Sequence, residues 1–592
     1  MKKIFATVLF AGLLCGCYED KGSYDYKLED ISGIGGTTGI SEMNEIVSVS
    51  FSPSIASGVE GNVIEVQKPL SEDEMLRRVE VNVTQTKATN IEKLNFFWCR
   101  TYTDAAGTEV KDTLTTPGYL ELEMPLDKDM SYNIFLRIYD TSTGLSFYEK
   151  FKVKTRPIFK NSLFVLHGEE GDRKLGNIEV VGNDTYVRTD VKQLPGAPDN
   201  DYSDGVGLAY TVYTDIHKSH PGYWVEECYL TLFDSKSGAI AYNPHGMNIR
   251  YSPEYMFVPY LPSVPSIQDG REEFVFKKMI QTGSHSSTTF FKIALSESGT
   301  VYTGNSVFQM FMPGYGNEVS AKPDPQHQAD YKITAATITE NRFVMWDAKH
   351  NRFLYSSKFD QYTNSYLEAG DATYLNEPVY DAMVDFSSLE KSPEGMTAVL
   401  GYINYRENYE EQPAYFVFKD EATGEFYRYK LTNSKSAATS GKSAFSIEGE
   451  KMKNFNPGEN LSTVTYNSWF TTNYLFYADG KFVYRYNLLN GDKMIVYEAP
   501  ELYNVNIIKF RAEDSEKMTH TADLGLYLSI GMYNGTNGAV AEVKLNANAD
   551  IDKDFAPLFY DSDENGVKWG KIKDLQFVHE YMYGTSNGLN DF

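Results

Sequence analysis

Apolar and polar residues alternate along most of this chain, in short runs that end at turn-forming residues. In 79–83 and again in 132–138, apolar side chains stand at every second position, which is the period of a β-strand with one buried face. Trp98 lies in an aromatic run at 94–98, much as immunoglobulin-like sandwiches place a buried tryptophan on a strand. We therefore predict an immunoglobulin-like β-sandwich over residues 46–157, closed by the strand-breaking Pro157.

Residues 158–592 repeat a different theme: an aromatic strand, an acidic or Asn/Gly turn, and another strand. Seven such turns follow one another at a mean step of about 62 residues, and they are marked by Gly171, Asp234, Glu297, Asp347, Asp420, Asn487 and Asn546. Regular hairpins of this period predict a β-propeller-like domain of about seven blades, with two or three packed sandwiches as the alternative. Because long segments with helical spacing are scarce, the predicted fold class is all-β.

The start of the chain has the pattern of an export signal. Two lysines precede the apolar run 4–14, which is too short to span a bilayer, since a spanning helix needs roughly 20 residues. Gly16 then precedes Cys17, as in a lipobox. We predict that residues 1–16 are a signal peptide, that Cys17 carries the lipid, and that 17–45 form a flexible acidic, glycine-rich tether. An ordinary secretory signal is the alternative.

Net charge and cysteine content limit which partners and metal sites we expect. The net charge of −26 repels phosphate backbones and anionic bilayer surfaces, so we expect no nucleic-acid partner. Beyond the signal region the chain has two cysteines besides the predicted lipidation site Cys17, and these are Cys99 and Cys228. They show no paired spacing of a zinc site, and we interpret both as small buried residues on strands.

Aromatic-rich loops in the second domain are the candidate ligand-binding elements. Exposed rings interleaved with turn and polar residues can stack on sugar faces, aromatic chelates or peptide side chains. The alternative is that these rings pack between blades. The candidate residues are Tyr223, Trp224, Phe311, Tyr315, Tyr405, Arg406 and Tyr409.

Motifs for metals and catalysis are incomplete. Asp561, Asp563 and Asn565 match the first half of a calcium loop, but the twelfth position, which should be a bidentate glutamate, is Ile572. We expect no cofactor, because a polar turn between strands explains this stretch without a metal; a structural calcium at this loop is the alternative. The chain lacks HExxH, whereas paired carboxylates for glycoside cleavage could come from different blades.

Two stretches carry a family resemblance. Residues 17–26, CYEDKGSYDY, and 131–140, SYNIFLRIYD, followed by Pro157-Ile158-Phe159, resemble the PKD-like family lipoproteins of gut-dwelling Gram-negative anaerobes. Family members commonly carry Asn where this chain has Ser23. The resemblance implies a PKD/Ig-like sandwich and an outer-membrane lipoprotein, with Glu19 and Asp20 as the signal for surface export. It also implies a TonB-dependent transporter and associated lipoproteins as partners in nutrient uptake.

These observations together favour binding over catalysis. We expect a lipid-anchored, cell-surface protein of the outer membrane whose propeller-like domain binds a glycan, a peptide or a metal chelate. A polysaccharide- or peptide-cleaving enzyme with carboxylates in the propeller funnel is one alternative, and a structural adhesin or scaffold is another.

Overall fold

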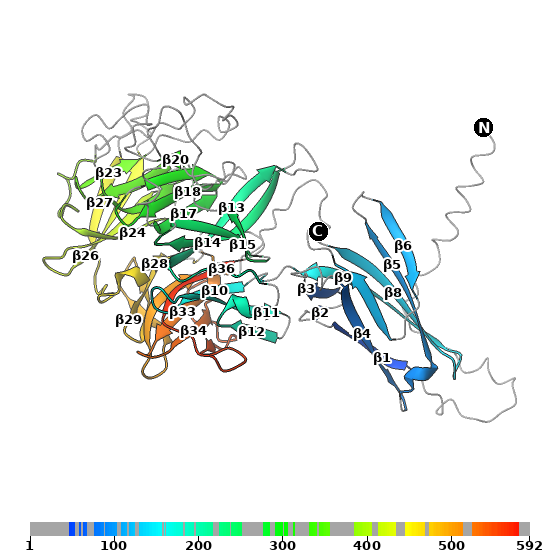
Figure 1. The fold of residues 1–592 in the computed structure, drawn as a ribbon. Coiled ribbons are helices and arrows are strands. Elements are labelled where there is room, and N and C mark those ends of the chain that lie inside the picture. The colour runs from blue at the N-terminus through cyan, green and yellow to red at the C-terminus, as the bar shows by residue number, and fades with distance from the viewer. Residues whose placement is uncertain are drawn as a thin grey trace, which may run out of the picture.

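The computed structural model describes most of two β-domains, which Figure 1 shows beside each other. The described residues are 46–53, 59–60, 63–67, 76–87, 89–103, 108–114, 118–124, 130–156, 159, 162–181, 184–194, 197–216, 224–236, 238–244, 246–251, 276–283, 290–299, 301–305, 312–313, 331–339, 342–355, 384–404, 413–433, 445–467, 470, 473–512 and 524–578. Within them, no helix has the length and apolarity needed to cross a membrane.

The first domain is a sandwich of two sheets. A three-stranded sheet has the order β1-β4-β7 and a six-stranded sheet the order β2-β3-β9-β8-β5-β6. Pairing is antiparallel except between β3 and β9, which run parallel. The elements are β1 (Ile46–Pro53), β2 (Val59–Glu60), β3 (Val63–Gln67), β4 (Leu76–Gln85), the 3-10 helix η4 (Ile91–Lys93), β5 (Leu94–Thr103), β6 (Glu109–Leu114), β7 (Tyr119–Glu123), β8 (Ser131–Asp140) and β9 (Ser146–Arg156).

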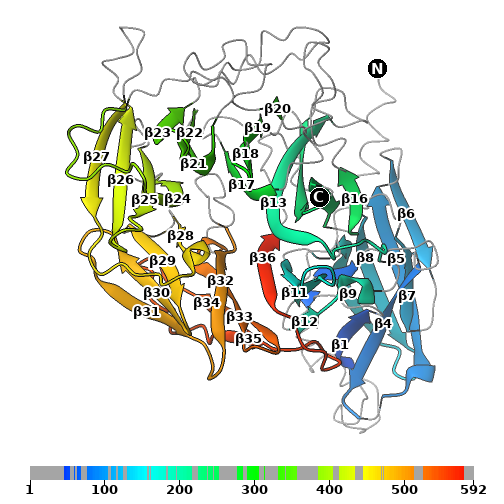
Figure 2. The same cartoon turned by 60° about the vertical axis from the view of Figure 1, so that its left-hand side comes forward.

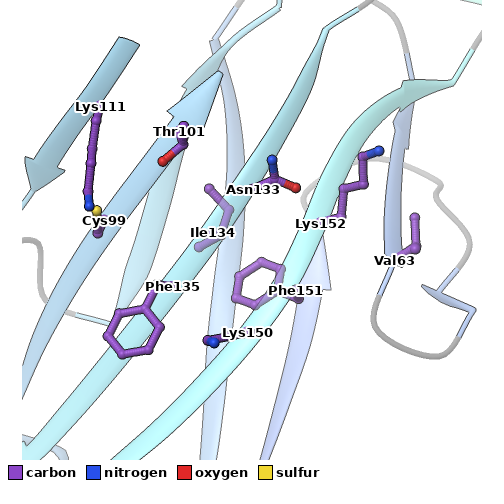
Figure 3. Close-up of a pocket in the computed structure, with 10 residues that line it drawn as sticks. All are labelled: Val63, Cys99, Thr101, Lys111, Asn133, Ile134, Phe135, Lys150, Phe151 and Lys152. Atoms are coloured by element: carbon purple, nitrogen blue, oxygen red, sulfur yellow. The ribbon is translucent and has the colours of Figure 1, made fainter. Parts of the chain in front are cut away.

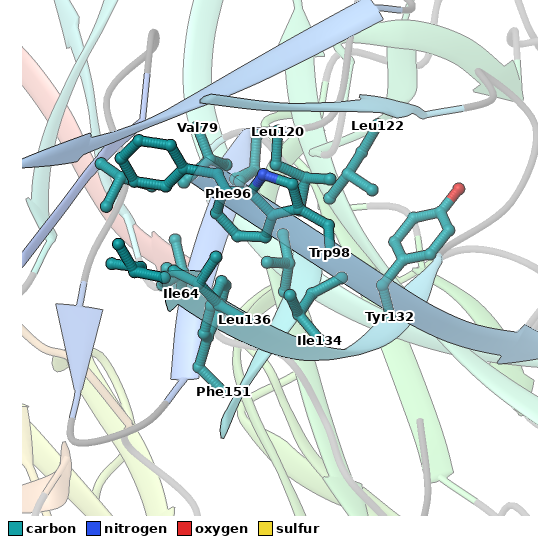
Figure 4. Close-up of a cluster of buried hydrophobic side chains, with 14 of the residues drawn as sticks. Ile64, Val79, Phe96, Trp98, Leu120, Leu122, Tyr132, Ile134, Leu136 and Phe151 are labelled. Atoms are coloured by element: carbon teal, nitrogen blue, oxygen red, sulfur yellow. The ribbon is translucent and has the colours of Figure 1, made fainter. Parts of the chain in front are cut away.

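The alternating residues of these strands build the sandwich core. On β8, every second residue from Tyr132 to Asp140 is buried. Trp98 is fully buried and meets the ring of Phe151 edge-on, with centroids 6.2 Å apart, as Figure 4 shows among the surrounding aliphatic side chains. The expected packing role of Trp98 is therefore confirmed.

The second domain is a seven-bladed propeller. Seven antiparallel sheets follow one another around a ring, which Figure 2 shows as a progression from cyan through green and yellow to red. Blade 1 combines β10 (Ser162–His167), β11 (Lys174–Val181) and β12 (Asp184–Arg188) with the last strand, β36 (Ile572–Val578). Blade 2 holds β13 (Gly205–Ile216), β14 (Trp224–Asp234), β15 (Gly238–Asn243) and β16 (Asn248–Tyr251), and blade 3 holds β17 (Phe276–Gly283), β18 (Phe290–Ser296), β19 (Val301–Asn305) and β20 (Met312–Pro313).

The later blades follow the same order. Blade 4 has three described strands, β21 (Ile333–Thr339), β22 (Arg342–Asp347) and β23 (Arg352–Tyr355). Blades 5, 6 and 7 have four each: β24 (Thr397–Ile403), β25 (Ala414–Lys419), β26 (Phe426–Asn433) and β27 (Phe445–Lys451); β28 (Thr465–Tyr466), β29 (Tyr474–Asp479), β30 (Phe482–Asn487) and β31 (Lys493–Glu498); β32 (Asn504–Phe510), β33 (Tyr527–Tyr533), β34 (Gly538–Lys544) and β35 (Leu558–Tyr560). Three 3-10 helices, η5 (Val191–Gln193), η9 (Leu461–Thr463) and η11 (Leu524–Leu526), join the described strands.

Local turn chemistry explains the repeat. Where the second strand of a blade ends, Asp234 and Asp420 each accept a hydrogen bond from the backbone N–H two residues later. A left-handed residue then ends the turn or starts the third strand, and glycine adopts this conformation at low cost. It is Gly238 in blade 2 (φ 91°) and Gly424 in blade 5 (φ 72°), whereas blade 4 uses Asn351 (φ 51°).

The ring is closed by the two ends of the domain. β36 pairs antiparallel with β10, so that Ser162 lies opposite Val578. The last strand of the chain thus becomes the first strand of blade 1. Hydrophobic clusters then fill the space between successive blades; one joins strands of blades 4 and 5 and another joins blades 6 and 7. This arrangement uses the aromatic and aliphatic residues of both faces of each blade.

The predicted fold class is confirmed: the chain is all-β, with a sandwich followed by a propeller. Five turn markers, from Gly171 to Asp420, lie at the end of the second strand or in the turn to the third strand of their blades. Asn487 ends the third strand of blade 6 and Asn546 follows that of blade 7, because these two blades make the earlier turn at Gly480 and Gly535. Each blade contains several turn signals, and their spacing alone does not show which two strands of a blade a given turn connects.

Candidate functional site

Propeller topology gathers several loops at one end of the ring. Every blade has the same antiparallel strand order, so all connections from first to second strands leave at the same end, which we call the first-turn end. Ile216 and Trp224 flank such a connection in blade 2, and Ile403 and Ala414 flank one in blade 5. The connection from the third to the fourth strand of blade 3 starts at this end as well.

These connections contain most of the candidate ligand-binding residues. Trp224 is the first residue of β14, and its side chain lies outside the described part of the structure. The other six, Tyr223, Phe311, Tyr315, Tyr405, Arg406 and Tyr409, also lie outside it. Their roles stay predictions, and the strand ends that flank them supply the geometry.

Below the 405–412 connection, tyrosines pack between blades 5 and 6. Tyr402 stacks on Tyr415 with ring centroids 5.2 Å apart and on Tyr466 at 4.2 Å. All three rings are buried, and the guanidinium of Arg428 lies 5.3 Å from the centroid of Tyr415. These three tyrosines therefore pack between blades. This is the role that the alternative interpretation gave to aromatic residues of the propeller.

Buried amides tie neighbouring blades together at the same end. Asn404 donates a hydrogen bond to the side-chain oxygen of Asn473 at 2.6 Å. Asn467, which is 1% exposed, donates to the carbonyl oxygens of Ala512 and Gly525 at 3.2 and 2.8 Å. These bonds join the ends of strands in blades 5, 6 and 7, so the loops rise from a fixed base.

A buried ion pair extends this base in blade 7. Arg511 donates to both carboxylate oxygens of Glu542, at 2.8 and 2.7 Å, and Ser529 donates to one of them at 3.0 Å. The guanidinium also lies 4.3 Å from the ring centroid of Tyr527 and 4.5 Å from that of Phe577. Because Phe577 belongs to β36, this cluster connects blade 7 with the strand that closes the ring.

Ring closure buries a histidine. His167 lies on β10, and its Nε2 is 2.7 Å from the carbonyl oxygen of Thr189, while its Nδ1 accepts a hydrogen bond from the Gly570 N–H at 3.0 Å. Trp569 meets the imidazole edge-on at 5.0 Å. Burial lowers the pKa of His167, so the ring is neutral, with Nε2–H donating to Thr189.

The calcium-loop candidates are engaged in hydrogen bonds. One oxygen of Asp563 accepts from the side chains of Thr189 and Gln193 at 2.9 and 3.1 Å, and the other accepts from two backbone N–H groups. Burial opposes ionisation of Asp563, but these donors lower its pKa overall. Asp561 pairs with Lys568 at 2.6 Å, which lowers the pKa of Asp561.

A bound cation would have to displace these donors. Asn565 takes part in the turn through its backbone N–H. Among the described residues, no group of three or more His, Cys, Asp or Glu is placed to hold a metal ion. Asp563 instead holds residues 561–567 against Thr189 and Gln193 of blade 1, and we call this loop the closure turn. Calcium binding there stays the untested alternative.

A concave region lies on the sandwich, on the outer face of the six-stranded sheet. It has a volume of about 590 Å³ and is lined by side chains from β3, β5, β6, β8 and β9, which Figure 3 shows on their neighbouring strands. Cys99 is a free thiol on this face. The prediction that Cys99 is buried is wrong. Its side chain points outward, because its neighbour Trp98 points into the core, and Cys99 is therefore only half-buried.

Comparison with known protein families finds a similarity in the N-terminal part of the chain. Residues 17–198 match the PKD-like family. The match covers the predicted tether, the sandwich and strands β10, β11 and β12 of blade 1. No curated protein shows a significant match to this sequence.

Solved structures with a related arrangement are distant. They include the WD40 domain of SCAP from fission yeast, with 10% identity, coverage of 84% of this chain and 98% of that chain, and a TM-score of 0.22. The β-propeller domain of Nup133 from Vanderwaltozyma polyspora has 7% identity, coverage of 71% and 90%, and a TM-score of 0.20. The extracellular domain of the hybrid two component system BT3049 from B. thetaiotaomicron has 7% identity, coverage of 86% and 77%, and a TM-score of 0.21.

Sequence reasoning missed two groups of residues. The pair Arg511 and Glu542 is separated by 31 positions and has no local motif. The lysines that line the concave region of the sandwich, Lys150 and Lys152 among them, did leave a signal, because they alternate with apolar residues on one strand. Only the neighbouring strands, however, show that these lysines surround a concavity.

Proposed function

We propose that this protein is a lipid-anchored surface protein of the outer membrane whose propeller binds a nutrient ligand at its first-turn end. The ligand would be a glycan, a peptide or a metal chelate, passed to a TonB-dependent transporter. One observation carries the proposal: the strand ends that flank the aromatic loops of blades 2, 3 and 5 share one end of a closed ring.

The base of this end supports binding physically. Recognition loops bind with less entropic cost when a rigid scaffold holds their ends. Here the scaffold is held by the Asn404–Asn473 and Asn467 hydrogen bonds and by the Arg511–Glu542 pair. A nutrient-binding loop set on such a base can vary in sequence without disturbing the ring.

The link between the domains supports a spacer role for the sandwich. Phe159, three residues after the end of β9, is 1% exposed and packs on Phe164 of β10 at 5.5 Å. This contact fixes the linker to the propeller where β10 begins, at the first-turn end. A lipid at Cys17 would then hold the binding end beside a transporter, and the resulting effective concentration would compensate for modest affinity.

Binding by the chain from residue 18 onward tests the proposal. Melting temperature is measured with neutral and acidic glycans, mixed peptides and ferric citrate, for the wild type and for W224A and R406A/Y409A. We expect at least one probe to raise the melting temperature of the wild type and to lose that effect in the variants. The matched control is L502A, because Leu502 is 80% exposed and lies between β31 and β32, at the opposite end.

Two results would overturn the proposal. Release of reducing ends or new amines during the incubations would make the protein an enzyme. An equal loss of ligand response in L502A would place the site at the other end of the ring.

A further inference from the structure

The outer face of the six-stranded sandwich sheet carries a positive cluster on an acidic protein. Lys111 on β6 and Lys150 and Lys152 on β9 line the concave region described above. The whole chain has a net charge of −26. Among the described residues no carboxylate lines this region, and none of the three ammonium groups forms an ion pair. We call this surface the basic face.

Aromatic rings continue the basic face on the same side of the sheet. Phe135 lines the concave region and lies 5.8 Å from the ring of Tyr148. Arg137 lies between rings, 5.7 Å from the centroid of Phe97 and 5.9 Å from that of Tyr148. Phe97 and Tyr148 are 37% and 44% exposed, so both side chains are accessible to a ligand.

The spacing of the charges indicates a repeating anion. Lys150 and Lys152 project from one strand two residues apart, which places their Cα atoms about 7 Å from each other. Lys111 stands three strands away in the order β9-β8-β5-β6, or about 14 Å across the sheet. A single phosphate cannot reach such spacing, whereas a polymer with a carboxylate on each unit can. Rings beside the charges suit sugar faces.

We propose that the basic face binds an acidic polysaccharide whose sugars carry carboxylates. The lysines pair with successive carboxylates, and Phe135 and Tyr148 stack on the sugar rings. Asn133 and Thr101, which also line the region, provide neutral hydrogen-bonding groups for hydroxyls. This site lies on the sandwich and is independent of the ligand proposed for the propeller.

Affinity electrophoresis and calorimetry of the chain from residue 18 onward test this site. The probes are oligogalacturonate, neutral dextran as the uncharged comparison, and single-stranded DNA as a polyanion of another class. We expect oligogalacturonate to bind and K150Q/K152Q to weaken that binding about five- to tenfold, because each exposed ion pair contributes modestly. Y148A should weaken it as well, and raised salt should weaken wild-type binding.

The matched control is K453Q/K553Q, which removes the same charge from exposed positions on the propeller and should leave oligogalacturonate binding unchanged. If this control weakens oligogalacturonate binding equally, the loss in K150Q/K152Q follows from net charge alone, and the proposal is overturned. So would absence of oligogalacturonate binding, equal binding of dextran, or tighter binding of single-stranded DNA.

Cys99 supplies a reporter inside the site. It lines the concave region, and replacing Cys15, Cys17 and Cys228 with serine leaves it as the single thiol of the chain. Oligogalacturonate should slow alkylation of Cys99 severalfold, and dextran should not. Oligogalacturonate binding that leaves the alkylation rate of Cys99 unchanged would place that ligand elsewhere and overturn the assignment.

Discussion

The pair of Arg511 and Glu542 gives the sharpest test of how the propeller is held together. Glu542 is 1% exposed, and its two oxygens accept three side-chain hydrogen bonds. In E542L the guanidinium of Arg511 would stay in place without its partner. Removing one member of a buried pair costs about 3–5 kcal/mol, because the remaining charge is left uncompensated.

The corresponding change in melting temperature follows from the size of the domain. Roughly 430 residues with an unfolding entropy of about 2.1 cal/mol/K each give about 0.9 kcal/mol/K at the midpoint. A loss of 3–5 kcal/mol then lowers the melting temperature by about 3 to 6 °C. The double variant R511M/E542L removes both charges, so its stability should return to within about 2 kcal/mol of the wild type.

Differential scanning calorimetry of the wild type, both single variants and the double variant measures this cycle. The expected result is a strong positive coupling between the two positions, because each single variant leaves a buried charge and the double variant leaves none. If the double variant loses as much stability as the two single variants added together, the pair does not stabilise the ring in the way described.

Three further predictions concern other parts of the chain. Because burial lowers the pKa of His167, its contribution to stability is complete above about pH 6.5 and is lost as pH falls toward the folded-state pKa, by up to about 1.4 kcal/mol per pH unit; thermal melts of H167Q should show a flatter pH dependence, and an unchanged profile would contradict this. C17S should abolish incorporation of labelled palmitate, whereas continued labelling would refute lipidation at that residue. D563N, which weakens the closure turn, should lower stability by about 1–3 kcal/mol equally with calcium or with EDTA; a loss seen only with calcium would instead support a calcium loop.

Much of the fold could be predicted because its signals are local. Alternation in 79–83 and 132–138 indicates half-buried strands, and an aspartate followed by a left-handed glycine indicates a turn, as at Asp234 and Asp420. The closure of the ring left no such signal. Val578 pairs with Ser162 across the whole domain, and pairing between distant segments depends on the assembled blades rather than on either strand alone.

The candidate site was predicted less completely, for a physical reason. Aromatic residues serve both packing and recognition, and sequence alone does not separate the two roles. Tyr402 and Tyr415 belong to the packing group, although they flank the loop that contains Tyr405 and Tyr409. The lysines of the basic face lie on two strands, β6 and β9, which share one face only in the folded sheet, so Lys111 could not be associated with Lys150 from sequence spacing.

Amide hydrogen exchange of the chain from residue 18 onward, with and without the probe that raises its melting temperature, tests whether the propeller binds its ligand at the first-turn end. We expect slowed exchange in 217–224 and 405–412, the connections at the first-turn end, with no change in the turns 235–238 and 421–424 at the opposite end. Protection confined to those opposite turns, or no protection in any propeller connection, would contradict ligand binding at the first-turn end.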